Sequence, residues 1–104
     1  MTLDMYTQKK YFNKVKIGDK LFLKDLSKIY NSFFESNIIY DKSFPGINSD
    51  MVSFSETFVT VIKKEVRNKS YIYYIKEDSG LWSWTLHFID ISKTFKEDIV
   101  LSIE

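Results

Sequence analysis

The clearest pattern in the chain is an alternation of hydrophobic and polar residues in the segment from Tyr71 to Ile91. In its second half, residues 82–88, two tryptophans, a leucine and a phenylalanine alternate with serine, threonine and histidine. This spacing is typical of a strand with one buried face. The preceding Asp78-Ser79-Gly80 supplies turn residues, because the two polar side chains can bond the local backbone and the glycine can adopt a left-handed conformation. The segment therefore predicts a β-hairpin.

The length of the hairpin loop decides which residues lie opposite each other. With a three-residue loop at residues 78–80, Tyr74 lies opposite Trp84 and Tyr73 lies opposite Thr85. A shift of one residue would turn every side chain of the second arm to the other face. We expect the rings of Trp82 and Trp84 to plug the interior of the domain.

Other segments also carry strand patterns. Residues 15–23 read as a strand with a turn or bulge at Gly18, and residues 57–66 are the most β-branched run in the chain, as expected for a central strand. Residues 67–70 form the next turn. Alternation at residues 99–103 predicts a final strand.

The hydrophobic period changes after Asp25. Apolar residues then follow the spacing of an amphipathic helix, which we expect from about Leu26 to Glu35 with Asp25 as its N-cap. The polar loop that follows contains Pro45-Gly46 and can carry a short strand at residues 38–40. Residues 1–13 are undecided between a helical turn and a flexible arm.

These elements predict a single domain, residues 1–104, of the α+β class and mainly β. We expect a small barrel or curled antiparallel sheet of about five strands with one short helix near residues 26–35. A chain of 104 residues buries roughly 65% of its unfolded surface. Phe, Tyr and Trp make up 17% of it, enough apolar area for a core without disulfides or metal.

Composition and charge narrow the setting. Cysteine is absent, which fits a reducing compartment, and the N-terminus lacks the apolar region of a signal peptide. No apolar run reaches the length of a membrane helix, so we expect an intracellular protein without membrane contact. The net charge is +1, yet the segment from Lys9 to Lys28 holds seven lysines and two aspartates. The first quarter of the chain is therefore basic.

Three segments resemble small proteins of phages and prophages of Gram-positive bacteria: IGDKLFLKDL, TFVTVIKKEV and YYIKEDSGLWSWTLHFIDI. In those proteins a Gly-Asp strand and a Glu-Asp-x-Gly-x-Trp-x-Trp hairpin belong to a Src-homology-3-like barrel. The resemblance implies that fold, a 3-10 turn at residues 85–87 and the cytoplasm of a bacterial host cell. The chain departs from the family at Ser55-Glu56, where a glycine is usual, and in residues 27–50, an inserted helix and loop.

Reactive chemistry is sparse. The single histidine, His87, lies on the polar side of its predicted strand, without a second histidine or a serine elbow, and is expected to be a solvated surface residue. Glu77-Asp78 offers too few ligands for a calcium or magnesium loop. No phosphate-binding glycine loop is present. We expect a non-catalytic protein with no catalytic residues, no metal and no cofactor.

Binding is therefore the expected function. The chain has more aromatic residues than its core needs, Tyr73 and Trp82 among them. Those we place in a protein-binding patch on the 27–50 insertion are Tyr30, Phe33, Phe34, Tyr40 and Phe44. The phage resemblance implies that the partner is a host protein, such as a defence nuclease, which the chain binds and inhibits in the manner of an anti-CRISPR protein.

Two alternatives stay open. A small barrel can bind nucleic acid through basic and aromatic side chains near one turn, and the candidates here are Lys63, Lys64, Arg67, Lys69, Tyr71 and Tyr73. The surplus aromatic residues can instead bury one another in a homodimer, as in a structural or accessory phage protein.

Overall fold

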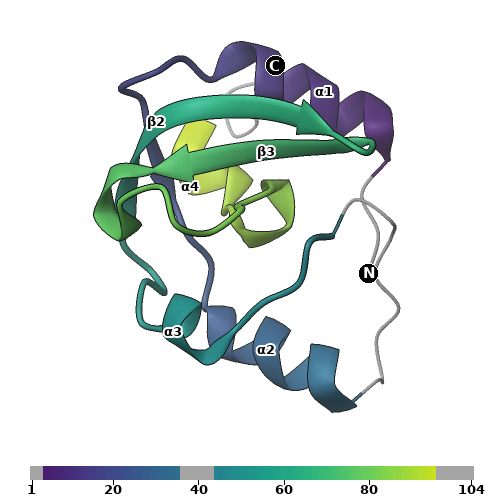
Figure 1. Cartoon of the computed structure of the whole chain (residues 1–104), viewed down its shortest axis with the longest axis vertical. Coiled ribbons are helices and arrows are strands. Elements are labelled where there is room, and N and C mark those ends of the chain that lie inside the picture. The colour runs from purple at the N-terminus through teal and green to yellow at the C-terminus, as the bar shows by residue number, and fades with distance from the viewer. Residues whose placement is uncertain (1–3, 36–43, 96–104) are drawn as a thin grey trace.

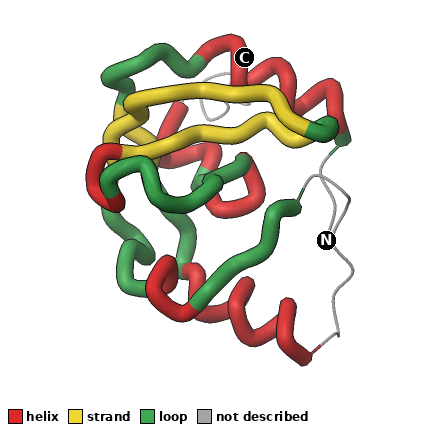
Figure 2. The backbone as a smooth tube through the Cα atoms, viewed as in Figure 1, coloured by secondary structure: helices red, strands yellow, loops and turns green. Residues whose placement is uncertain are grey.

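The structure is a computed structural model in which residues 4–35 and 44–95 are described. Within these residues the chain forms a three-stranded antiparallel sheet in the order β1-β2-β3, surrounded by helices (Figures 1 and 2). The elements are α1 (Met5–Lys14), β1 (Lys20–Phe22), α2 (Leu26–Glu35), α3 (Ser49–Val52), β2 (Phe58–Arg67), β3 (Ser70–Ile75), η1 (Lys76–Asp78), η2 (Leu86–Phe88) and α4 (Ile91–Phe95). The chain is thus a small α+β domain.

The prediction of about five strands in a Src-homology-3-like barrel is wrong for the described residues. The second arm of the 71–91 hairpin meets β3 only where Trp84 pairs with Tyr73, and the chain then turns into the 3-10 helix η2. A 3-10 turn at this place was implied by the family resemblance. The strands expected at residues 38–40 and 99–103 lie outside the described residues.

The β2–β3 hairpin follows the sequence pattern closely. β2 lies in the centre of the sheet, paired with β1 on one side and β3 on the other, as its β-branched composition predicts. Asn68 and Lys69 connect the strands with positive φ angles of 51° and 68°. A two-residue turn with both φ angles positive matches the twist of the flanking strands, so the predicted turn at residues 67–70 is confirmed.

The register of the next turn differs from the prediction by one residue. Tyr73 and Trp84 exchange two backbone hydrogen bonds, with N···O distances of 2.7 and 3.0 Å, where we expected Tyr73 opposite Thr85. The cause is a longer connection, because residues 76–78 form the 3-10 helix η1 and the Gly80 N–H donates to the Ile75 carbonyl at 2.9 Å. The expected three-residue loop would have left no room for that helix.

Residues 5–14 form a regular helix, α1, and not a flexible arm. The Asp4 carboxylate caps it by accepting from the Thr7 N–H at 2.8 Å. At the other end, the Lys64 ammonium group donates to the carbonyls of Phe12 and Val15 at 2.6 and 2.7 Å. A cation at a helix C-terminus neutralises the unpaired carbonyls there, so β2 holds the end of α1 in place.

α2 has the predicted bounds, Leu26–Glu35. The side chain of Asp25 accepts from the Ser27 N–H at 3.1 Å, as expected of a capping residue, and the Ser55 hydroxyl accepts from the Leu26 N–H at 2.8 Å. The second bond joins the start of α2 to the segment before β2. α2 and α3 together form the end of the molecule opposite α1 (Figure 1).

The core lies between the sheet and the helices. Trp84 is 1% exposed and packs at right angles to the rings of Phe54 and Phe88, whereas Trp82 is only half-buried, so one of the two expected indole plugs is present. The free edge of the sheet on each side is paired at one position. Leu23, directly after β1, pairs with Ile89, and β3 pairs with Trp84 through Tyr73.

Candidate functional site

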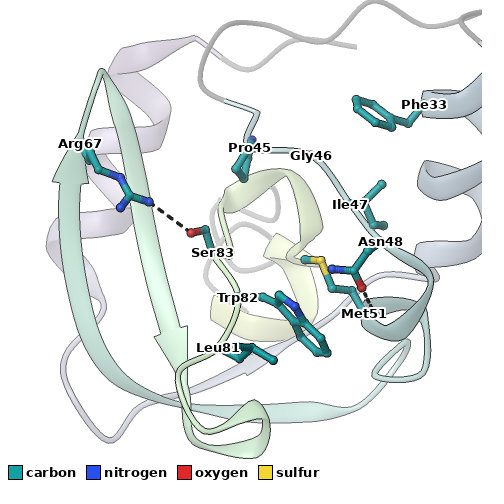
Figure 3. A pocket seen from close by; sticks show the side chains of 10 residues that line it. All are labelled: Phe33, Pro45, Gly46, Ile47, Asn48, Met51, Arg67, Leu81, Trp82 and Ser83. Atoms are coloured by element: carbon teal, nitrogen blue, oxygen red, sulfur yellow. Dashed lines mark hydrogen bonds between the residues drawn. The ribbon is translucent and has the colours of Figure 1, made fainter.

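A groove of about 570 Å³ opens between α2, α3 and the segment that follows the η1 turn. Its walls come from parts of the chain far apart in sequence, and Figure 3 shows Phe33 and Arg67 on opposite sides with Pro45 between them. We call it the Phe33–Trp82 groove. The lining residues are Phe33, Pro45, Gly46, Ile47, Asn48, Met51, Arg67, Leu81, Trp82 and Ser83.

The first wall is built from α2 and the loop before α3. Phe33, 37% exposed, contacts the ring of Phe44 at a centroid distance of 5.4 Å. Phe44 in turn packs on Phe88 at 5.4 Å, so the exposed ring stands on the core. Gly46 has a φ angle of +102°, which an L residue with a side chain rarely adopts, and this lets the loop bend beside Phe33.

The second wall is the segment from Leu81 to Ser83, and Asp78 shapes it. The Asp78 carboxylate accepts from the backbone N–H groups of Gly80, Leu81 and Trp82 and from the indole N–H of Trp84, at 2.9, 3.1, 3.3 and 2.8 Å. This holds Leu81 outward, 68% exposed, and leaves Trp82 half-buried. The wall therefore presents a large apolar surface on a backbone fixed by one carboxylate.

Among the described residues that line the groove, Arg67, at the end of β2, is the one with a charged side chain. Its guanidinium group donates to the Ser83 hydroxyl at 3.4 Å, so it is turned toward the groove (Figure 3). Close by, the Tyr74 hydroxyl donates to the Glu65 carboxylate at 2.6 Å and lowers the pKa of that carboxyl. Glu65 is not among the described residues that line the groove, so Arg67 supplies their charge.

The protein-binding candidates divide into three groups. Phe33 lines the groove, and Phe44 supports it from behind. Tyr30 is half-buried and packs against the core. The side chain of Phe34 and all of Tyr40 lie outside the described residues. Trp82 was expected among the surplus aromatic residues, whereas Leu81, Met51 and Arg67 were not expected here, because only the tertiary fold brings them to Phe33.

The nucleic-acid candidates do not form one surface. Tyr73 is 0% exposed and part of the core, and burial raises the pKa of its phenol. Lys64 points inward to the end of α1, and Tyr71 is half-buried with its ring 5.1 Å from that of Phe12. Lys63, Arg67 and Lys69 are the exposed members. Alternation along β2 and β3 separates the two groups, because neighbouring residues of a strand face opposite sides.

His87 is not the solvated residue that the alternating pattern predicted. It is 2% exposed, its Nδ1 lies 2.7 Å from the Thr85 hydroxyl, and its ring meets the edge of Phe44 at 5.2 Å. The prediction is wrong because η2 replaces the strand, and a 3-10 helix turns successive side chains by about 120° where a strand alternates them. His87 is thus a packed residue behind the groove.

Among the described residues, no group of three or more histidine and acidic side chains can hold a metal ion. In the same part of the chain, no helix has the length and apolar character needed to cross a membrane. Comparisons of the chain with models of known protein families, with curated proteins and with solved structures found no match.

Proposed function

We propose that the protein is a non-catalytic binding protein that holds a segment of a partner protein in the Phe33–Trp82 groove. The observation that supports this is the exposure of Phe33 and Leu81 on two facing walls. Phe33 packs on Phe44, and the backbone of Leu81 is hydrogen-bonded to Asp78. Buried apolar area contributes about 25 cal/mol per Å², and interfaces concentrate their energy in such aromatic and apolar anchors. The groove thus has the features of an interface centre.

The chemistry of the groove points to one kind of occupant. Its walls are apolar and aromatic, and Arg67 at one end supplies the charge. A complementary segment therefore carries one or two bulky apolar side chains for Phe33, Leu81 and Trp82, followed by a carboxylate for the guanidinium group. Arginine and a carboxylate form a strong, directional pair, so Arg67 would set the direction in which the segment lies.

The resemblance to small phage proteins suggests the setting. On that basis we propose that the partner is a bacterial host protein in the cytoplasm, such as a defence nuclease, and that binding inhibits it. The departure from the family in residues 27–50 supports a specialised role for this region, because α2 and the loop after it supply the first wall.

A direct test uses a random-peptide library selected against the purified protein, with fluorescence anisotropy of the selected peptides. We expect enrichment of apolar residues next to Asp or Glu. Leu81→Ser and Arg67→Gln should each weaken binding by about tenfold or more, as truncated interface anchors do. Both residues are exposed, so the melting temperature should change little.

The matched control is Phe58→Ser, which removes another exposed apolar residue, 54% exposed, that lines no part of the groove. Binding unchanged by Leu81→Ser, or weakened equally by Phe58→Ser, would contradict the proposal. If the protein instead self-associates in sedimentation and Leu81→Ser abolishes it, the occupant is a second copy of the chain and the partner-protein proposal fails.

A further inference from the structure

We propose that the outer face of α1 is a second binding surface, separate from the Phe33–Trp82 groove, and that it binds single-stranded nucleic acid. α1 lies at the end of the molecule opposite α2 and α3 (Figure 1). The proposal rests on the side chains that this helix exposes and on their charge.

The exposed side chains of α1 form one stripe. Tyr6, Lys9, Lys10 and Asn13 are spaced at i, i+3, i+4 and i+7, which places them on one side of a helix. They line a shallow hollow of about 370 Å³, and Tyr6 is 79% exposed. An exposed ring beside two ammonium groups is the combination that single-strand binding proteins use, with stacking on a base and pairing with phosphates.

The charges within the sequence segment that carries this stripe are of one sign. From Met5 to Gly18 the chain contains four lysines and no acidic residue. The two aspartates that flank the stretch form hydrogen bonds to the backbone. The Asp4 carboxylate accepts from the Thr7 N–H, and the Asp19 carboxylate accepts from the Lys16 N–H at 2.8 Å. They are held at the two ends of the stretch, beside the backbone groups they cap, and the lysines between them remain a block of positive charge.

The helix dipole does not offset this charge. The C-terminus of a helix carries a partial negative charge, which would reduce the positive potential near Lys14. Here the Lys64 ammonium group lies on the carbonyls of Phe12 and Val15. One lysine from β2 therefore neutralises the negative end of α1, and the surface lysines contribute their full charge to a polyanion.

The buried face of α1 argues against a lipid surface as the partner. A helix that lies in a membrane interface needs an apolar face for the lipid. That face of α1 is already packed in the protein, with Tyr11 against Phe95 at 4.5 Å and Phe12 against Tyr73 at 5.5 Å. What remains exposed is basic and aromatic, which fits phosphates and unpaired bases.

The probe is a fluorescently labelled, mixed-sequence single-stranded DNA, titrated with the full chain and followed by anisotropy. If about four phosphates are neutralised, affinity should fall about fiftyfold between about 50 and 200 mM salt. The double variant Lys9→Glu, Lys10→Glu should weaken binding by more than tenfold. Tyr6→Ala should weaken it by about 5- to 150-fold through lost stacking.

The matched control is the double variant Lys63→Glu, Lys69→Glu, which makes the same change in net charge at the exposed β2–β3 turn. It should leave binding within about twofold, and so should Leu81→Ser in the groove. Three results would overturn the proposal: no binding at micromolar protein, equal loss in both lysine variants, or equally tight binding of polyglutamate or anionic vesicles. Circular dichroism of each variant confirms that the helix is intact.

Discussion

Replacing Asp78, in the turn after β3, by alanine should clearly destabilise the protein. Its carboxylate lies at the beginning of the Leu81–Ser83 wall. It accepts hydrogen bonds from four groups, the backbone N–H groups of Gly80, Leu81 and Trp82 and the indole N–H of Trp84. Asp78→Ala removes the carboxylate that these four N–H groups share as acceptor, while leaving the backbone of the turn free to adopt the same conformation.

The expected cost follows from what each donor can do afterwards. The N–H groups of Gly80 and Leu81 keep their bonds to the backbone carbonyls of Ile75 and Asp78, and that of half-buried Trp82 can bind water in part, so these three losses contribute little. The Trp84 side chain is 1% exposed, and its indole N–H would stay buried without a partner. A buried unpaired donor costs about 1–3 kcal/mol, and the three other lost bonds add about 1 kcal/mol together, so we expect a total loss of about 2–4 kcal/mol. The free energy of unfolding of a whole domain is typically about 5–15 kcal/mol.

Urea unfolding followed by tryptophan fluorescence measures this loss, and the melting temperature should fall by about 10–20 °C. The Trp84 indole proton resonance should also move in the NMR spectrum. Asp19→Ala is the matched control, since it removes a carboxylate with one exposed backbone partner and should have a small effect. If Asp78→Ala costs no more than Asp19→Ala, the reasoning is refuted.

Two further predictions concern the backbone and the charges. Glu56 has a φ angle of +55°, so Glu56→Gly should raise the free energy of unfolding by about 0.5–1 kcal/mol, measured in urea, whereas Glu56→Ala keeps the strain and should bring no gain. The Lys93 N–H donates to the Asp90 carboxylate at 3.0 Å and lowers the pKa of that carboxyl. A group with a lowered folded pKa stabilises the protein above its unfolded pKa and loses this effect as the pH falls through the folded pKa. The urea midpoint should therefore drop as the pH falls through and below the ordinary pKa of an aspartate, and Asp90→Asn should make that drop smaller. An equal drop in both proteins would contradict the assignment.

The sequence predicted best the elements whose pattern is local. The bounds of α2, the central place of β2 and the Asn68-Lys69 turn all follow from periodicity and turn chemistry within ten or so residues. Glu56, just before β2, adopts a left-handed backbone with a φ angle of +55°, a conformation that glycine adopts at less cost. These features depend little on the rest of the fold.

The predictions that failed depend on contacts between distant residues. The register slipped by one because the Asp78 carboxylate binds the Trp84 indole and stabilises the η1 turn, which alternation cannot reveal. α1 is fixed by Lys64, some fifty residues away. The groove needs Arg67 and Leu81 beside Phe33, so the sequence indicated its aromatic members without indicating its shape.

The covered edges of the sheet have a consequence for how partners are recognised. Beside β1, the Phe22 N–H donates to the Thr94 hydroxyl, and the Phe22 carbonyl accepts from the Asp90 N–H at 2.8 Å. On the other side, the backbone N–H and carbonyl groups of Tyr73 are hydrogen-bonded to Trp84. A strand from another chain can join the edge of a sheet only where backbone N–H and carbonyl groups are unpaired. At these positions the fold discourages fibril-like stacking and leaves discrimination between partners to side-chain shape and charge.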